Sequence, residues 1–332
     1  MKADRIFKNA KIFTSDKDKP MASSLVVKDG KFLYVGNEAG LSAYEGEITD
    51  LGGKFIMPGI IDSHVHVTMA AAFEYAELGV SIIGEGKQKI LDFMSAHIQN
   101  NPGRKCYRFM LDKRLLDGTE LVKEDLDAVC PDSELIIIED EMHSCWVNSK
   151  VLALHGINDD TPDPIPGLSY YVRKDGHVTG NVGGRPIELW TSLLGKERAS
   201  KMYRCKTLWN SGALVTWSSD EIFYTDFTHW SPYLAMEVGM TRWINEKTKM
   251  EEESRTVTEF PPASEKMSIE EMILGYTING AKQLGIEDSK GSIEAGKDAD
   301  FLVFDNDLLT AEHEGFSHNK PSEVFICGEK VN

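Results

Sequence analysis

The sequence predicts a mixed α/β protein, and three observations support this fold class. Short apolar runs of strand length occur along the chain and dominate both of its ends. Between them lie segments whose apolar residues recur at helical spacing. Hydrophobic residues make up 41% of the 332 residues, enough for a large buried core, which excludes a disordered or low-complexity chain.

The N-terminal part is predicted to consist mainly of β-strands. Arg5–Phe13, Ser24–Val27 and Lys31–Val35 are short apolar-rich runs, and Asp29-Gly30 predicts a hairpin turn between the last two. The next run, Lys54–Ile61, is almost entirely apolar. Such a run predicts a strand that is buried on both faces, as in a parallel sheet.

The middle of the chain is predicted to alternate between helices and strands. Its segments are a helix over Gln88–Gln99, buried strands over Tyr107–Leu111 and Leu135–Ile138, a hairpin over Tyr170–Val182 that turns at Asp175-Gly176, a helix over Glu197–Asn210 and a strand over Ala213–Ser218.

The C-terminal part returns to β-structure after a loop and a helix. Lys247–Lys266 is charged and aperiodic and is predicted to be a long loop. Ser268 and Glu271 form a capping-box pattern, which opens a helix that closes near Gly285. Two further strands are predicted, over Asp300–Asp305 and Glu323–Cys327.

The charge balance bears on possible partners and on the compartment. The chain has 36 Lys+Arg and 53 Asp+Glu, a net charge of −17, which argues against nucleic acid or an anionic membrane as the main partner. We find no apolar run near the roughly 18 residues of a spanning helix, and the N-terminus does not resemble a signal peptide. The five cysteines are scattered, which favours reduced thiols and a cytoplasmic location.

The sharpest chemical signal is the pair His64 and His66, which follows the apolar run over Lys54–Ile61. Alternate residues of a strand point to the same side, so both imidazoles and the Asp62 carboxylate would project together. Two imidazoles held in this way can share one Zn²⁺-class ion. The alternative is a pair of unrelated polar residues at a strand end, but the apolar strand before them favours a metal site.

Asp220 is the second candidate, because it follows the apolar run Ala213–Ser218. Barrel enzymes place catalytic groups at the carboxyl ends of such strands. Asp220 could ligate the metal, accept a proton from metal-bound water, or do both. The alternative is an Asp that forms a turn or caps a helix.

The third candidate is the segment Glu139–Ser149, which contains His143 and Asn148 and also follows an apolar strand. His143 could contact a substrate, orient another site residue or serve as a spare metal ligand. Asn148 is grouped with it as a residue that contacts the substrate or supports the site. The alternative for His143 is a packed, hydrogen-bonded side chain beside Trp146.

Together these motifs resemble the amidohydrolase superfamily, in particular the branch with N-substituted formamide deformylases and other metal-dependent hydrolases. The matching pieces follow the family's order over most of the chain. They are Met57–His66, His143–Ser149, Gly156-Ile157, Thr161–Pro164, Gly212–Asp220, Thr277–Ala281 and Gly291–Phe301. The last of these is the most specific, and it resembles the strand that returns to a small β-sandwich built from both termini.

The resemblance implies a (β/α)₈ metal-dependent hydrolase barrel with that β-sandwich attached. Residues 1–55 and 286–332 would form the sandwich, and residues 56–285 the TIM-barrel-like domain. The family's metal site uses a His-x-His after strand one, a carboxylated Lys or a Glu after strand four, a His after each of strands five and six, and an Asp after strand eight. His64 and His66 match the first element and Asp220 the last; the other three have no match.

The length predicts an incomplete barrel. Barrel strands are placed near residues 56, 107, 135 and 213, and only 30 residues, 183–212, separate the predicted hairpin from the last of them. One β/α unit takes roughly 30 residues, so strands four to seven do not fit. We expect a junction between Gly183 and Leu194. The exposed strand edges could pair within the chain or with a second copy, and we expect a homo-oligomer.

The resemblance implies a hydrolase that cleaves a non-peptide C–N bond in a small amide, N-acyl or cyclic-amide substrate, with metal-activated water. Zinc is the expected metal, and iron, manganese and nickel stay open. A fourth metal contact could come from Glu139, Asp140, His143 or a second chain. The alternative is a non-catalytic or internally deleted relative with an impaired metal site. An unrelated α/β binding protein is opposed by the ordered motifs.

Overall fold

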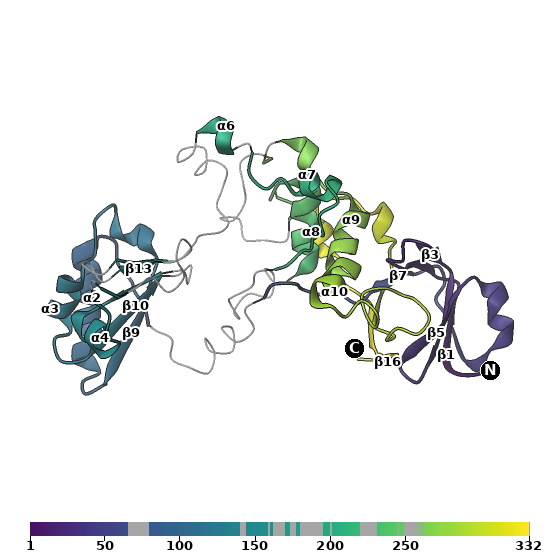
Figure 1. The fold of residues 1–332 in the computed structure, drawn as a ribbon, viewed down its shortest axis with the longest axis horizontal. Helices are drawn as coiled ribbons and strands as arrows, with labels where there is room; N and C mark the ends of the chain where they lie inside the picture. The colour runs from purple at the N-terminus through teal and green to yellow at the C-terminus, as the bar shows by residue number, and fades with distance from the viewer. Residues whose placement is uncertain are drawn as a thin grey trace. The chain divides into compact units, whose positions relative to one another are not determined.

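The structure is a computed structural model in which the chain forms two compact units. One unit joins Met1–Val67 to Pro186–Asn332, and the other is Thr68–Arg185. Both contain a sheet and helices, which confirms the predicted mixed α/β class (Figure 1). The structure describes residues 1–65, 80–139, 144–158, 160–161, 170–172, 177–179, 195–199, 201–219, 231–244, 246–248, 259–260 and 262–331.

Four N-terminal strands form the first sheet: β5 (Lys31–Gly36), β4 (Ser24–Lys28), β1 (Lys2–Lys8) and β6 (Glu45–Asp50), in that order. β4 is antiparallel to both of its neighbours, and β6 runs parallel to β1. The turn between β4 and β5 places Asp29 at φ 51° and Gly30 at φ 76°. Two successive positive φ angles are what a tight hairpin of this kind requires, so the predicted hairpin is confirmed.

Six strands from both ends of the chain form the second sheet: β16 (Glu329–Lys330), β15 (Glu323–Ile326), β14 (Phe301–Phe304), β7 (Phe55–Pro58), β2 (Lys11–Phe13) and β3 (Met21–Ala22), in that order. β7 is antiparallel to β14 and parallel to β2. The placement of a barrel strand near residue 56 is therefore wrong, because the backbone hydrogen bonds of β7 are used within this terminal sheet.

The two central strands of this sheet, β7 and β14, are buried on both faces, as predicted for the run after Lys54. One face packs against the first sheet in a shared core that contains Phe7, Leu25, Val27, Phe32, Ile56, Phe301 and Val303. The opposite face packs against helices and contains Phe55, Met57, Leu302 and Phe304. The alternation follows from the period of two along a strand, and it accounts for the unbroken apolar sequence.

Two helices cover that second face, α8 (Pro232–Thr241) and α9 (Ile269–Tyr276), and α10 (Ile278–Leu284) follows α9 and contacts it. Ser268 Oγ accepts a hydrogen bond from Glu271 N at 3.2 Å, and the Glu271 carboxylate accepts one from Ser268 N at 2.8 Å, which confirms the capping box. The predicted single helix is instead interrupted at Thr277, and its second part ends at Gly285, whose φ is 68°.

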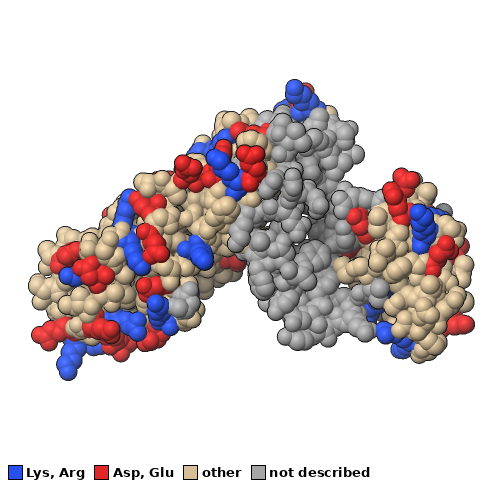
Figure 2. Space-filling view, turned by 180° about the vertical axis from the view of Figure 1, so that it is seen from behind, with Lys and Arg blue, Asp and Glu red and all other residues tan. Residues whose placement is uncertain are grey.

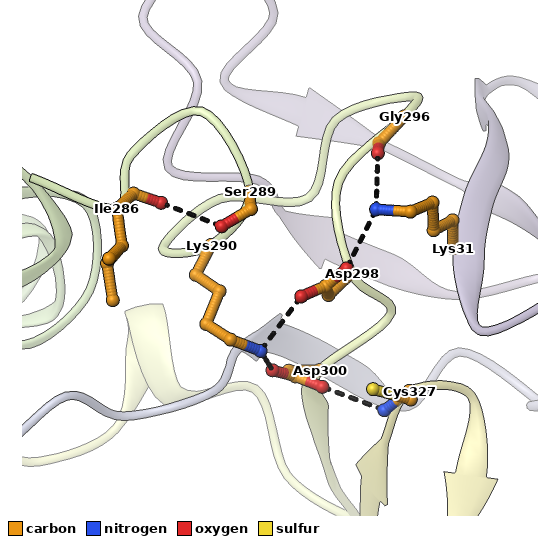
Figure 3. A network of polar contacts seen from close by, with 8 residues as sticks. All are labelled: Lys31, Ile286, Ser289, Lys290, Gly296, Asp298, Asp300 and Cys327. Carbon is orange, nitrogen blue, oxygen red and sulfur yellow. Dashed lines mark hydrogen bonds and ion pairs between the residues drawn. The ribbon is translucent and has the colours of Figure 1, made fainter.

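A polar network ties the segment before β14 to both sheets (Figure 3). Asp298 accepts from Lys31 of β5 at 2.9 Å and from Lys290 at 3.1 Å. Lys290 also contacts Asp300 at 2.5 Å, and Asp300 accepts from the backbone N–H of Cys327 at 2.8 Å. The C-terminal motif thus joins strands that lie far apart in the sequence.

The sheet of the other unit has six strands: β12 (Tyr170–Val172), β13 (His177–Thr179), β11 (Ser144–Val147), β10 (Glu134–Glu139), β9 (Cys106–Leu111) and β8 (Val80–Ser81), in that order. The last three are parallel, and the first three join by antiparallel pairing. The predicted strands over Tyr107–Leu111 and Leu135–Ile138 are confirmed. The helices are α2 (Lys87–Asn100), α3 (Lys123–Val129) and α4 (Ser149–Leu154), and α2 confirms the helix predicted over Gln88–Gln99.

Two predicted elements before α8 are wrong. Residues 213–219 form no strand, since their described backbone joins no ladder. The helix predicted over Glu197–Asn210 is two short helices, α6 (Lys196–Ala199) and α7 (Cys205–Asn210), and Tyr203 between them has a φ of 52°. Periodicity in the sequence did not reveal the left-handed residue that breaks the helix.

The face in Figure 2 carries acidic and basic side chains interspersed over the described surface. The excess of acidic residues along the sequence is thus not gathered into one acidic area on that face. Among the described helices, none is both long and apolar enough to cross a membrane.

Candidate functional site

The segment that follows β7 leads to the predicted metal ligands, and two distant parts of the chain hold it. Ile61 donates its backbone N–H to the carbonyl of Tyr276 at 2.7 Å, at the end of α9. Ser63 donates from Oγ to the carbonyl of Trp217 at 2.8 Å, and its backbone N–H approaches the same oxygen at 3.3 Å. The backbone of residues 61–63 is therefore positioned by both α9 and residues 213–219.

Asp62 connects the two segments on which the predicted ligands lie. The backbone N–H of Ser219 donates to both carboxylate oxygens, at 3.2 and 3.1 Å, and that of His64 donates to Oδ1 at 3.2 Å. Ser219 and Asp62 are 157 residues apart in the sequence. The Asp62 carboxylate therefore links the backbone of these two segments through N–H groups.

The structure places only one of the three predicted metal ligands. His64 is exposed, two residues beyond Asp62. His66 and Asp220 lie outside the described residues, as does His143. Their immediate neighbours Val65 and Ser219 are described, and the hydrogen bonds of Asp62 bring the segments of these neighbours together.

Within the described ranges, no group of three or more His, Cys, Asp and Glu side chains could hold a metal ion. The predicted cluster of His64, His66 and Asp220 is not tested by this result, since two members lie outside those ranges. The chemistry of the donors does fit a zinc-class ion, which prefers imidazole nitrogen and carboxylate oxygen.

Asn148, the remaining predicted site residue, has a structural role and is 1% exposed. Its Oδ1 accepts from Leu135 N at 3.2 Å and from Val151 N at 3.3 Å, so it caps α4. Its Nδ2 donates to the carbonyls of Cys130 and Ser133 at 3.0 and 2.9 Å. These four bonds use all the hydrogen-bonding positions of the amide, and none is left for a substrate.

Tyr276, whose carbonyl accepts from Ile61 N, is a residue that the sequence motifs did not indicate. It is completely buried, and its hydroxyl makes no hydrogen bond to any residue that the structure describes. Burial raises the pKa of Tyr276, and the negative charge of Asp62 raises it further. The only signal in the sequence was its position directly before the motif that begins at Thr277.

Comparison with known families gives one extended match. The model of the family described as "Amidohydrolase family" matches residues 47–185 and 185–331. Together these segments cover most of the chain, and they meet at residue 185. The boundary between the two compact units falls at the same place, between Arg185 and Pro186.

Individual relatives match parts of the chain. The exoenzymes regulatory protein AepA of Pectobacterium carotovorum subsp. carotovorum is 31% identical over 186 residues, which are 54% of this chain and 40% of AepA. The N-substituted formamide deformylase of Arthrobacter pascens is 27% identical over 197 residues, 58% of this chain and 35% of the deformylase. The chain thus spans 40% and 35% of the length of these relatives.

A solved structure of an uncharacterized metal-dependent hydrolase from Pyrococcus furiosus aligns with 92% of this chain and 100% of its own, with a TM-score of 0.49 and 15% identity.

Proposed function

The chain belongs to the amidohydrolase family, and from this premise we propose that it is a metal-dependent hydrolase of a non-peptide C–N bond. The substrate would be a small amide, N-acyl or cyclic-amide compound. The N-substituted formamide deformylase among the relatives supports this substrate class. The metal would be a divalent ion, with zinc as the first candidate because of the imidazole and carboxylate donors.

The observation that carries this proposal is the pair of hydrogen bonds from Ser219 N to the Asp62 carboxylate, at 3.1 and 3.2 Å. They join the segment that carries His64 to the segment that ends immediately before Asp220. A metal site needs its ligands from these two segments to be close together. Asp62 would hold the two segments together through its hydrogen bonds to their backbone N–H groups.

The residues would divide the chemistry as follows. A divalent metal, when bound, would polarise the substrate carbonyl and lower the pKa of a water molecule. His64 and His66 would hold it through imidazole nitrogens, together with one oxygen of Asp220. Asp220 would also accept the proton of the attacking water and return it to the leaving nitrogen.

Metal analysis of the purified protein tests the proposal. We expect about one zinc-class ion per chain. We expect His64→Ala to weaken the binding of added Zn²⁺ at least tenfold. Loss of a residue that supports a metal ligand typically lowers metal affinity about 10- to 100-fold, and loss of the ligand itself should lower it at least as much. The control is His155→Ala, since His155 is also exposed but lies in the other unit, directly after α4. Absence of stoichiometric metal from the wild type, or unchanged affinity in His64→Ala, would contradict the proposal.

The alternative is a non-catalytic relative that lacks an internal part of the family's barrel. Two findings support a junction in the predicted region: the family match breaks at residue 185, and the three middle metal-site elements have no counterpart in the sequence. Steady hydrolysis of a formamide or other amide, lost in Asp220→Asn, would reject this alternative. Stoichiometric metal without turnover on a panel of such amides would favour it.

Three further predictions stay proposals. The first is the division into two domains, a β-sandwich (1–55 with 286–332) and a barrel-derived domain (56–285). The pairing of β7 with β14 supports moving the boundary at residue 55 beyond Pro58. The second is a cytoplasmic location, which the five free cysteines support. The third is a homo-oligomer, for which the molar mass in solution is the measurement.

A further inference from the structure

The segment 213–219 makes hydrogen bonds along one of its two edges. Its backbone contains no helix, turn or bend, so it has the course of a strand although it joins no ladder. The carbonyl of Val215 accepts from Asn279 Nδ2 at 2.9 Å, and that of Trp217 accepts from Ser63 Oγ at 2.8 Å. In a strand, the backbone groups of alternate residues point to the same edge. The edge that carries the groups of Val215 and Trp217 therefore faces the rest of its own unit.

The opposite edge of this segment consists of the backbone N–H and C=O groups of Leu214, Thr216 and Ser218. None of these groups makes a hydrogen bond to a residue that the structure describes. The side chain of Leu214 is also 53% exposed. A row of unpaired donors and acceptors is the feature by which the edge of a sheet accepts another strand. We call these three pairs of groups the open edge.

The charge of the chain favours a second copy of it as the strand that pairs there. The net charge is −17, so two copies repel each other on approach. The stretch Thr207–Ser219 contains no charged residue, so two open edges can meet without like charges at the contact. A strand of opposite charge would find no side chain in this stretch with which to form an ion pair.

The order of the groups along the open edge also suits a two-fold pair. Antiparallel pairing centred on Thr216 places Leu214 of one copy opposite Ser218 of the other, and Thr216 opposite itself. The residues of each such pair exchange both of their backbone hydrogen bonds. The N–H and C=O groups of all three residues are then satisfied in both copies, as the accounting of backbone groups requires.

We propose that the open edge is a dimer interface, at which residues 214–218 pair antiparallel with the same residues of a second copy. This inference rests on the homo-oligomer proposed above, for which it names the contact, and it depends neither on the metal ligands nor on the hydrolase activity. The contact is short, so the dimer should be reversible and should form as the protein concentration rises.

Sedimentation equilibrium over a range of concentrations tests the proposal. We expect the molar mass of the wild type to rise from one chain to two. Leu214→Pro removes an N–H group of the open edge from each copy, so it should raise the dissociation constant roughly tenfold or more through the loss of two hydrogen bonds. Leu214→Glu, which brings a carboxylate into the contact, should weaken the dimer as well, and it serves if the proline variant does not fold. The matched control is Leu154→Glu, since Leu154 is 59% exposed and lies in the other unit.

Amide hydrogen exchange at low and high protein concentration locates the contact. We expect the amides of Leu214, Thr216 and Ser218 to exchange more slowly as the dimer forms. A wild type that remains a monomer at every concentration would overturn the proposal, as would a dimer that neither Leu214 variant weakens. Slow exchange of these amides in the monomer would show that another segment of this chain covers the open edge, and it would also overturn the proposal. Zinc binding is measured separately, so failure of the dimer leaves the proposed hydrolase standing.

Discussion

At the residue scale, the carboxamide of Asn148 and the carboxylate of Asp62 show how similar polar side chains take different roles. Asn148 is enclosed in the unit formed by Thr68–Arg185, where its four hydrogen bonds join β10, α4 and the turn between α3 and β10. Asp62 is only partly buried and joins two segments by backbone N–H groups alone. The first is a link within one unit, and the second joins the two segments that we propose to carry the metal ligands.

We expect Asn148→Ala to lower the free energy of unfolding by about 3 kcal/mol, through loss of the α4 cap and of hydrogen bonds to buried backbone groups. Asn148→Asp keeps the accepting oxygen but loses both donated bonds, so its loss should be large as well. Urea unfolding measures the change. Zn²⁺ affinity should not change in the folded variants, and a selective loss of affinity without loss of stability would show that Asn148 belongs to the site.

At the scale of elements, the backbone at Gly291 lies very close to α10, and this contact determines how the C-terminal motif (Gly291–Phe301) packs. Gly291 has a φ of 88°, and a Cβ at this position would lie 2.5 Å from Ala281 Cβ and 3.0 Å from the carbonyl oxygen of Thr277. The start of α10 therefore lies directly against the motif. Gly296 has a similar φ of 95°, but a Cβ added there would meet nothing within 4 Å.

This pair of glycines separates backbone strain from close packing. We expect Gly291→Ala to lower the free energy of unfolding by roughly 2–4 kcal/mol, because strain at positive φ adds to a clash with α10. Gly296→Ala should cost only about 1 kcal/mol, from the strain alone. Chemical denaturation of both variants measures the difference, and equal losses would exclude the close approach as the cause.

At the scale of the whole molecule, hydrogen-bonded carboxyl groups link stability to pH. Burial alone would raise the pKa of Glu265, but hydrogen bonds from the Thr207 hydroxyl and N–H and from Arg204 lower it to about 2. Hydrogen bonds from Lys31 and Lys290 likewise lower the pKa of Asp298. Such groups bind fewer protons in the folded state than in the unfolded state, so they stabilise the fold at neutral pH.

We therefore expect the free energy of unfolding to decrease as the pH falls below about 4.5, the ordinary pKa of a glutamate, and to go on decreasing towards pH 2. Glu265→Gln should be less stable than the wild type at pH 6, and the difference should shrink towards pH 3. Urea denaturation between pH 6 and pH 3 is the measurement. Glu120→Gln, which changes an exposed residue, is the control, and a difference for Glu265→Gln that does not depend on pH would contradict the assignment.

Local patterns predicted those elements whose sequence signals act over a few residues. The hairpin at Asp29-Gly30, the capping box at Ser268 and the strands over Tyr107–Leu111 and Leu135–Ile138 are of this kind. Ala213–Ser218 has the composition of a strand but lacks a ladder partner in the described structure. A strand pairs with other strands that can lie far away in the sequence, and the composition of an apolar run does not indicate which strands these are.

The sequence by itself determined the family motifs, the candidate ligands His64, His66 and Asp220, and the apolar character of β7 and β14. Only the tertiary structure decided that β7 belongs to the terminal sheet, that Asn148 is saturated by backbone groups, and that Ile61, the residue before Asp62, bonds to the carbonyl of Tyr276. The physical reason is the distance along the sequence between the residues that interact. Side-chain chemistry and periodicity can be recognised from a few neighbouring residues. Hydrogen-bond saturation and the burial of a single hydroxyl depend on contacts between segments that are far apart in the chain.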